Sequence, residues 1–180
     1  IFNSLNSIQR MYVEGNEDSA NDYMADFSRL LRSILENSGK HRISLKEELE
    51  LTTNYLDLEK LRTRDLFSYT IEVSDAVDPL IVKVPPLIFQ PYIENAIWHG
   101  ILPKNANGHI TLKVEKKSGG LLCTVTDDGV GFDRSLENKK HDGKESKGMA
   151  ITAERLGGEK NVTVETLTGG GTQVKLKMIG

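Results

Sequence analysis

The stretch PPLIFQPYIENAIWHG, residues 85–100, places polar groups at the end of an otherwise apolar segment. Two prolines open it, and we expect a helix from there to Gly100. Its apolar residues suit burial against a core, whereas Glu94, Asn95 and His99 bring a carboxylate, an amide and an imidazole to the last two turns. Polar groups on a buried helix need polar partners, and other parts of the sequence indicate which.

The composition is that of a globular protein without a nucleic-acid partner. Of 180 residues, 38% are apolar and 27% are charged, and the net charge is −3. No cluster of Lys and Arg forms the basic stripe that binds phosphate backbones. No run of 18 apolar residues exists, so we expect no membrane contact from this chain. The start at Ile1, without Met, predicts a piece of a longer protein.

The only cysteine, Cys123, lies in the apolar run LLCTV. One cysteine allows neither an internal disulfide nor a zinc framework. We expect it to be a small buried side chain in a protein of a reducing compartment.

Two helical segments are predicted at the start of the chain. Residues 1–13 form the first, which ends at Gly15 and Asn16. In residues 20–39, apolar side chains recur three and four positions apart, which predicts a second helix.

A third helix is predicted from a capping box, in which Ser44 is followed three residues on by Glu47. Its apolar pattern continues to Arg62. The apolar faces of these helices are wide enough to form a homodimer, or they cover the domain behind them. We assign residues 1–63 to a helical dimerisation region and residues 64–180 to a second domain.

After the third helix the apolar period changes from helical to alternating. The segments FSYTIEV, GHITLKVEK, GLLCTVTD, NVTVETL and TQVKLKM read as strands. Strands on both sides of two helices favour an α+β sandwich behind an N-terminal helical hairpin. Residues 133–147 have few apolar residues and no period, so they form either a lid or an idle surface loop.

Three glycine-marked turns accompany these strands. TDDGVGF puts Gly129 and Gly131 just after the carboxylate of Asp127 at a strand end, a pattern that suits an exocyclic amine but also occurs in ordinary turns. Gly148 opens a helix whose first N–H groups suit phosphate. GGGTQV ends at Thr172 and the last strand. Together with residues 85–100, these turns predict a nucleotide pocket.

These motifs resemble, in order and spacing, the ATP-binding domain of sensor histidine kinases, gyrase-type ATPases, Hsp90 and mismatch-repair ATPases. Asn95 matches the N box, Asp127, Gly129 and Gly131 the G1 box, Gly148 the G2 box, and Gly171 with Thr172 a G3-like turn. QPYIENAIWHG, SLKEELELTTNYLDLEKLR and the opening IFNSLNSI are similar more narrowly to sensor kinases of the LytS and YehU type.

The resemblance implies ATP and Mg²⁺ as cofactors. Asn95 then coordinates Mg²⁺ through its amide, because Mg²⁺ takes few protein oxygens beside phosphate and water. Asp127 receives the adenine amine, and Gly129 and Gly131 admit the base. Residues 133–147 become the ATP lid. The remaining implied contacts to nucleotide come from Lys147, Gly148, Met149 and Thr172.

Glu94 and His99 are candidate catalytic residues, since either side chain can order a water or touch phosphate. His99 can equally be a helix-end imidazole that interacts with nearby carbonyls.

The family's phosphoryl acceptor is a histidine in a motif close to HFIFNSLN, and this chain begins at that motif's third letter. The acceptor is therefore expected two residues before Ile1, outside the chain. The resemblance implies a histidine kinase that works as a homodimer with a response regulator, of the LytTR class. The chain would be the cytoplasmic part of a membrane-anchored sensor.

The sequence also departs from the family pattern. Relatives usually carry Lys or Arg where Trp98 stands, and often read GIGLKN where this chain reads SKGMAI, with Ser146 and Ile151 at the altered positions. Lys147 is a candidate replacement for the lost cation. These departures leave open a degenerate module that dimerises without kinase activity. A water-attacking ATPase is disfavoured, because Pro91 stands where such enzymes place a general-base glutamate.

Overall fold

The computed structural model describes residues 2–131 and 147–179 of the chain. The chain begins with the three helices α1 (Phe2–Val13), α2 (Glu17–Ser38) and α3 (Leu45–Arg62). The predicted capping box is present: Ser44 Oγ accepts the Glu47 N–H, and the Glu47 carboxylate accepts the Ser44 N–H at 2.7 Å. The three predicted helical segments are thus confirmed, and each ends within a few residues of its expected limits.

A five-stranded mixed sheet forms the other half of the molecule. Its strands are β2 (Phe67–Val73), β4 (Gly108–Lys117), β5 (Gly120–Asp127), β6 (Val162–Thr166) and β7 (Thr172–Ile179). They lie in the order β2-β4-β5-β7-β6. Only β2 and β4 are parallel, whereas the other neighbours are antiparallel. The five predicted strands therefore all form, and Asp127 pairs with Thr172 across β5 and β7.

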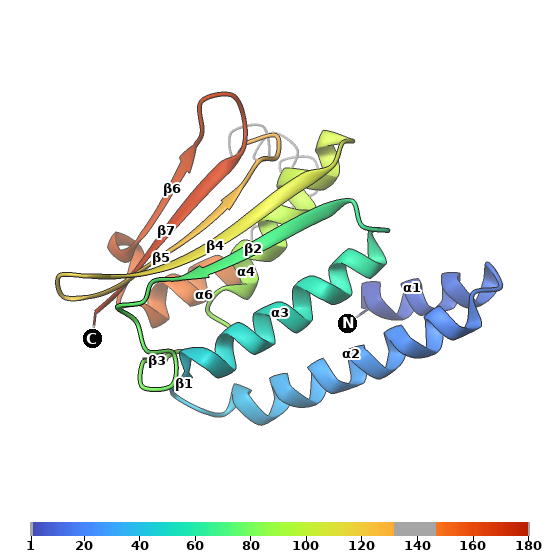
Figure 1. Cartoon of the computed structure of the whole chain (residues 1–180), viewed down its shortest axis with the longest axis horizontal. Helices are drawn as coiled ribbons and strands as arrows, with labels where there is room; N and C mark the ends of the chain where they lie inside the picture. Colours follow the sequence, from blue (N-terminus) through green and yellow to red (C-terminus); the bar gives the residue numbers. More distant parts are fainter. Residues whose placement is uncertain (1, 132–146, 180) are drawn as a thin grey trace.

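Helices cover one face of this sheet (Figure 1). They are α3, α4 (Gln90–Asn95) and α6 (Lys147–Arg155), with α2 and α1 packed beyond α3. A π-helix, η1 (Ala96–Ile101), continues α4, and two short 3₁₀ turns, η2 (Leu102–Lys104) and η3 (Glu159–Asn161), follow later. The short strands β1 (Ile43–Ser44) and β3 (Lys83–Val84) form a separate two-stranded sheet, and β1 leads directly into α3.

The helix of residues 85–100 starts later than its sequence predicts. Pro86 to Phe89 form a turn in which Leu87 has a φ of +58°, and the helix begins at Gln90 with Pro91 in its first turn. The carboxylate of Glu48 holds this turn by accepting the N–H groups of Leu87 and Phe89. The expectation that one helix runs from the prolines to Gly100 was therefore wrong. The contact from α3 stabilises a turn in place of the first helical turn.

Helix α3 contributes to two hydrophobic cores. Leu45 and Leu56 belong to the sandwich core, which also holds Phe89, Ile97 and Cys123. Leu51 and Leu58 face the other way, into a smaller cluster with Ile8, Tyr23 and Leu30. The α1–α2 layer therefore rests on a helix that is itself part of the sandwich.

The α+β fold with N-terminal helices in front of an α/β sandwich is confirmed, and Cys123 is buried as predicted. Within the described part of the chain, no helix has the length and apolar character needed to span a membrane.

Candidate functional site

The carboxylate of Asp127 lies at the end of a central strand and is almost fully buried, at 5% exposure. Its Oδ1 accepts the N–H of Gly129 at 2.9 Å. Thr172, its partner on β7, contributes a backbone and a side-chain hydrogen bond. A buried acceptor at the end of a strand is thus fixed by two neighbouring turns, the predicted G1-like and G3-like turns.

Three glycines pack closely around Asp127 and its neighbours. A Cβ at Gly100 would lie 2.6 Å from Asp127 Oδ1, and one at Gly171 would lie 2.2 Å from the Asp127 carbonyl oxygen. A Cβ at Gly129 would lie 2.3 Å from the carbonyl carbon of Gly100. The Val130 N–H donates to the Gly100 oxygen at 3.0 Å and joins the end of η1 to the DDG turn. Only glycine allows these three backbones to pack so closely.

Gly100 was not singled out as a site residue in the sequence, although it ends the quoted stretch. The sequence motifs predict that Gly129 lets a nucleotide base approach the backbone. In the structure, Gly129 packs against Gly100. Gly131 has a φ of +91°, which favours glycine, and a Cβ there would lie 3.0 Å from Thr166 Cγ2. A glycine that follows a helix carrying an N-box asparagine is the signal that could have found Gly100.

Asp128, the neighbour of Asp127, has a different environment. Its Oδ1 accepts the His109 N–H at 2.8 Å, and its Oδ2 lies 3.1 Å from Lys104 Nζ. The side chain is 51% exposed. Asp128 therefore ties the turn to the start of β4, and leaves the inner position to Asp127.

Burial raises the pKa of Asp127 to about 6, and the neighbouring Asp128 adds to the rise. Hydrogen bonds from the Gly129 and Thr172 backbone act in the opposite direction. The group is thus ionised at neutral pH, where a carboxylate can accept an amine hydrogen, and is protonated in mild acid.

The amide of Asn95 lies at the junction of α4 and the π-helix η1. Its Nδ2 donates to the Pro91 carbonyl at 2.7 Å, one turn earlier, so the amide nitrogen is directed along the helix. Short π-helical segments are rare and often occur at functional sites. His99 lies in η1, half-buried, four residues after Asn95.

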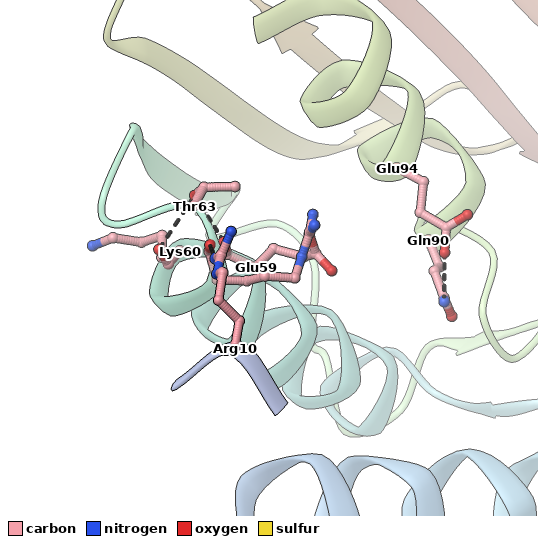
Figure 2. Close-up of polar contacts among 7 residues, drawn as sticks. Arg10, Glu59, Lys60, Thr63, Gln90 and Glu94 are labelled. Carbon is pink, nitrogen blue, oxygen red and sulfur yellow. Dashed lines mark hydrogen bonds and ion pairs between the residues drawn. The ribbon is translucent and has the colours of Figure 1, made fainter. Parts of the chain in front are cut away.

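Glu94 faces the helical layer. Its Oε1 accepts a hydrogen bond from Gln90 at 3.0 Å, one turn earlier on α4 (Figure 2). Burial raises the pKa values of Tyr55 and Glu59, both on α3, and the charge of Glu94 adds to the rise. The structure therefore brings Glu94 close to α3, while Gly100 from the same segment meets Asp127.

Trp98 also contacts α3. The Arg62 guanidinium lies over its ring, 3.8 Å from the centroid. Arg62 donates from Nε to Glu59 at 2.9 Å, and the two side chains are only 10% and 9% exposed. Where the resemblance implies a cation, this chain has an aromatic ring that binds a cation from α3.

Two residues without a predicted role connect the helices α3 and α6 to the turn before α4. Glu48 of α3 accepts the Leu87 N–H at 2.7 Å and the Phe89 N–H at 3.3 Å. Arg155 of α6 donates to the Pro86 carbonyl at 3.2 Å. No local sequence signal marks these contacts, because the partners are 39 or more residues apart.

Several predicted residues fall on or near the boundary of the described chain. Lys147, Gly148 and Met149 form the first turn of α6, and Ile151 in the same helix is 53% exposed. Ser146 and most of the expected lid, residues 133–146, lie outside the described residues.

The donor set fits a nucleotide-borne magnesium better than a metal site made by protein alone. Among the described side chains, no three His, Cys, Asp or Glu residues cluster to hold a metal ion. Mg²⁺ needs only one or two protein oxygens when phosphates complete its coordination. Asn95 offers such an oxygen, and Asp127 with its glycines offers a buried acceptor for a base.

Comparison with known proteins gives sequence relatives along most of the chain. The histidine kinase family model matches residues 1–67. "Sensor histidine kinase YpdA" from Escherichia coli is 32% identical over 133 residues, 74% of this chain and 23% of the relative. "Sensor protein LytS" from Enterococcus faecalis is 29% identical and covers 98% of this chain and 31% of the relative. The chain thus spans about a quarter to a third of the length of these relatives.

Solved structures share the fold. A histidine kinase domain from the Erythrobacter litoralis EL346 blue-light activated histidine kinase has a TM-score of 0.54 at 20% identity, covering 93% of this chain and 82% of that one. A bacterial phosphotransferase has a TM-score of 0.58 at 13% identity, covering 97% and 86%.

Proposed function

Because this chain belongs to the sensor histidine kinases of the LytS type, we propose that it binds Mg-ATP at the Asp127 site and serves as a catalytic portion of such a kinase. The full protein would transfer the γ-phosphoryl group to a histidine and then to a response regulator of the LytTR class. The chain would be the cytoplasmic part of a membrane-anchored sensor.

The buried Asp127 carboxylate carries this proposal. It lies at a strand end, is ionised at neutral pH, and is surrounded by backbone that only glycine permits. We assign it the exocyclic amine of adenine, with Thr172 beside it and Gly129 and Gly131 in the adjoining turn. A charge-assisted hydrogen bond in a buried site contributes about 1.5 to 3 kcal/mol.

Asn95 and the start of α6 are assigned to the phosphates. The Asn95 amide oxygen would hold Mg²⁺, which supplies charge neutralisation between the phosphates. The first N–H groups of α6, at Lys147, Gly148 and Met149, lack partners within the helix and suit phosphate oxygens. Positioning and electrostatics, rather than covalent chemistry by the protein, would account for most of the rate.

The phosphoryl acceptor is proposed to be none of the chain's own histidines. His109 lies on β4 with both ring nitrogens close to hydroxyls, Nδ1 2.8 Å from Ser68 Oγ and Nε2 3.1 Å from Thr70 Oγ1. His41, His99 and His141 stand outside the family's acceptor motif. The acceptor would lie before Ile1 and be presented by the helical region of a homodimer. Val13 and Leu35, 82% and 66% exposed, are apolar candidates for that interface.

One observation favours a second function, that of a dimerising module without kinase activity. Trp98 occupies a position where relatives usually have a cation, and its ring is engaged by Arg62. It therefore supplies no charge to a phosphate. Such a module would retain the fold and the helical interface with weak or absent nucleotide binding.

A calorimetric titration with an unhydrolysable ATP analogue, with and without Mg²⁺, tests the proposal. We expect saturable binding that tightens with Mg²⁺. Asp127→Asn removes the charged acceptor and should weaken affinity roughly ten- to a hundredfold. Asp128→Asn is the matched control, because this exposed neighbour contacts His109 and Lys104 instead.

Absent binding at millimolar nucleotide would reject the kinase assignment of this site and favour the dimerising module. Equal losses for the two aspartate variants would reject Asp127 as the base acceptor.

A further inference from the structure

A cavity of about 820 Å³ lies at the end of the sheet opposite Asp127. Lys116, Gly120 and Leu121 of the β4–β5 hairpin, Arg155 and Leu156 of the α6 end, and Met178 of β7 line it, together with residues from the loop that precedes β3. Gly120 and Asp127 are the two ends of β5, so the cavity lies about 23 Å from the proposed nucleotide site. Neither the sequence motifs nor the proposed function accounts for it.

The walls of this cavity are largely apolar. Of its lining residues, Leu156 and Met178 are buried and Leu121 is half-buried. Ile81, on the loop side, is 74% exposed although it is a large apolar side chain. Exposed apolar surface gathered around a concavity is typical of binding sites.

Cations surround the same cavity. Its lining includes four basic side chains, Arg42, Lys83, Lys116 and Arg155, but only one acidic side chain, Asp78. Among the described side chains, none of the four forms an ion pair with a carboxylate within 4.0 Å. These four basic side chains gather around one cavity although the net charge of the chain is −3. Lys83 and Arg155 also interact electrostatically with the carboxylates of Glu47 and Glu48, which do not line the cavity. Four cations against one carboxylate in the lining still favour an anion there.

Two of these cations are held in position by backbone. Arg155 donates to the Pro86 carbonyl at 3.2 Å, and Arg42 donates to the Lys83 carbonyl at 3.5 Å. Asp78 Oδ1 accepts the Leu80 N–H at 2.9 Å. The positive groups are thus partly preorganised, while the single carboxylate is engaged within its own turn.

We propose that this cavity binds a small amphiphilic anion, a free molecule with a carboxylate head and an apolar body. Its volume lies in the range of small-molecule sites, its apolar side chains would contact the apolar body, and its basic side chains would bind the head. Lys83 and Lys116 would bind the carboxylate, and Ile81 and Leu121 would pack on the chain. The proposal does not depend on ATP binding.

Octanoate is the probe, titrated by calorimetry into the nucleotide-free chain. We expect saturable one-to-one binding. The matched controls are 1-octanol, which has the chain without the charge, and acetate, which has the charge without the chain. Each should bind at least roughly tenfold more weakly, because it lacks one of the two complementary parts.

Two pairs of variants locate the ligand. Ile81→Glu places a carboxylate on the cavity wall and should weaken octanoate binding roughly tenfold or more. Leu80→Glu is its control, because Leu80 is also highly exposed, at 64%, but does not line the cavity. Lys116→Ala should weaken binding a few-fold, whereas Lys117→Ala, one residue along the same hairpin and outside the cavity, should not. All four positions are exposed, so the fold should be retained.

No octanoate binding, or equal affinity for 1-octanol, would overturn the proposal. Equal losses for Ile81→Glu and Leu80→Glu would overturn the location. Binding to vesicles of an anionic phospholipid without binding to octanoate would replace the small free ligand with a membrane surface.

Discussion

The segment of residues 85–100 meets a buried carboxylate at each end, and the two carboxylates differ in their neighbours. At its start, Glu48 is 1% exposed and accepts the N–H groups of Leu87 and Phe89, one on each oxygen. At its end, Gly100 lies against Asp127, which is 5% exposed. Near the first carboxylate lie apolar side chains such as Leu51 and Ile93, whereas close glycine backbone surrounds the second.

The comparison separates burial from function. Burial raises the pKa of both groups, Glu48 to about 7 and Asp127 to about 6. A raised pKa alone would thus have marked both as candidate sites. Both Glu48 oxygens already hold the turn before α4, which explains this group structurally. The glycines around Asp127 let the neighbouring backbones pack closely against it, and its carboxylate remains the proposed acceptor for nucleotide.

The largest effect is expected where the two backbones touch at the Asp127 end. Gly129→Ala would place a Cβ 2.3 Å from the Gly100 carbonyl carbon and should lower the free energy of unfolding by more than about 3 kcal/mol. Gly39→Ala is the control, because its Cβ meets nothing within 4 Å, and it should be neutral or slightly stabilising. Denaturant unfolding measures both. A Gly129→Ala protein as stable as wild type would contradict the crowding of this end.

At the other end, the pH dependence of stability should report Glu48. Its pKa in the folded protein, about 7, exceeds its ordinary value of 4.5, so its stabilising contribution is complete below pH 4.5 and is lost as pH rises through 7. Between pH 4.5 and 7 the wild type should lose free energy of unfolding on the order of 3 kcal/mol, and the Glu48→Gln variant should not show this loss.

Unfolding of wild type and variant across pH 4.5 to 8 measures this difference. Glu50→Gln, on the exposed side of the same helix, should leave the wild-type profile unchanged. Parallel profiles for Glu48→Gln and wild type would show that the buried carboxylate is not the titrating group. Arg155, which faces Glu48, favours the charged form and limits the loss.

Asp127 should instead control nucleotide affinity. Below its pKa of about 6 the carboxyl is protonated and no longer accepts a charge-assisted bond, so affinity for the ATP analogue should fall about tenfold from pH 7 to pH 5. The phosphates of the ligand also titrate in this range. Their effect cancels when the affinity of the wild type is divided by the affinity of the Asp127→Asn variant at each pH. If the ratio of the two affinities stays constant with pH, Asp127 does not bind the base.

The smallest effect concerns the contact between Arg62 of α3 and Trp98 of η1. A double-mutant cycle of Arg62→Ala and Trp98→Ala should give a coupling free energy of about 1 kcal/mol, from the cation over the ring. Arg62 keeps its contact with Glu59 in the Trp98→Ala variant, so the cycle isolates the ring. Additive losses would mean that the cation over the ring contributes no free energy to the attachment of η1 to α3.

Much of the fold was accessible to sequence reasoning, because the relevant signals are local. The Ser44–Glu47 capping box, the helical period of α2 and the alternation of β2 and β5 each involve residues only a few positions apart. The order of the glycine motifs also predicted Asp127 and Thr172, which the sheet register then places side by side. Their roles toward nucleotide, with those of Asn95 and the α6 turn, stay predictions.

What the sequence by itself determined was the set of helices, strands and turns, and the candidate chemistry at each turn. Only the tertiary structure decided that Glu48 holds the turn before α4, that Trp98 meets Arg62, and that β2 pairs with β4 in parallel. These contacts join residues 36 to 41 positions apart, and no local period or cap encodes them. They form because distant apolar faces must be buried together, which brings the polar groups beside them into contact.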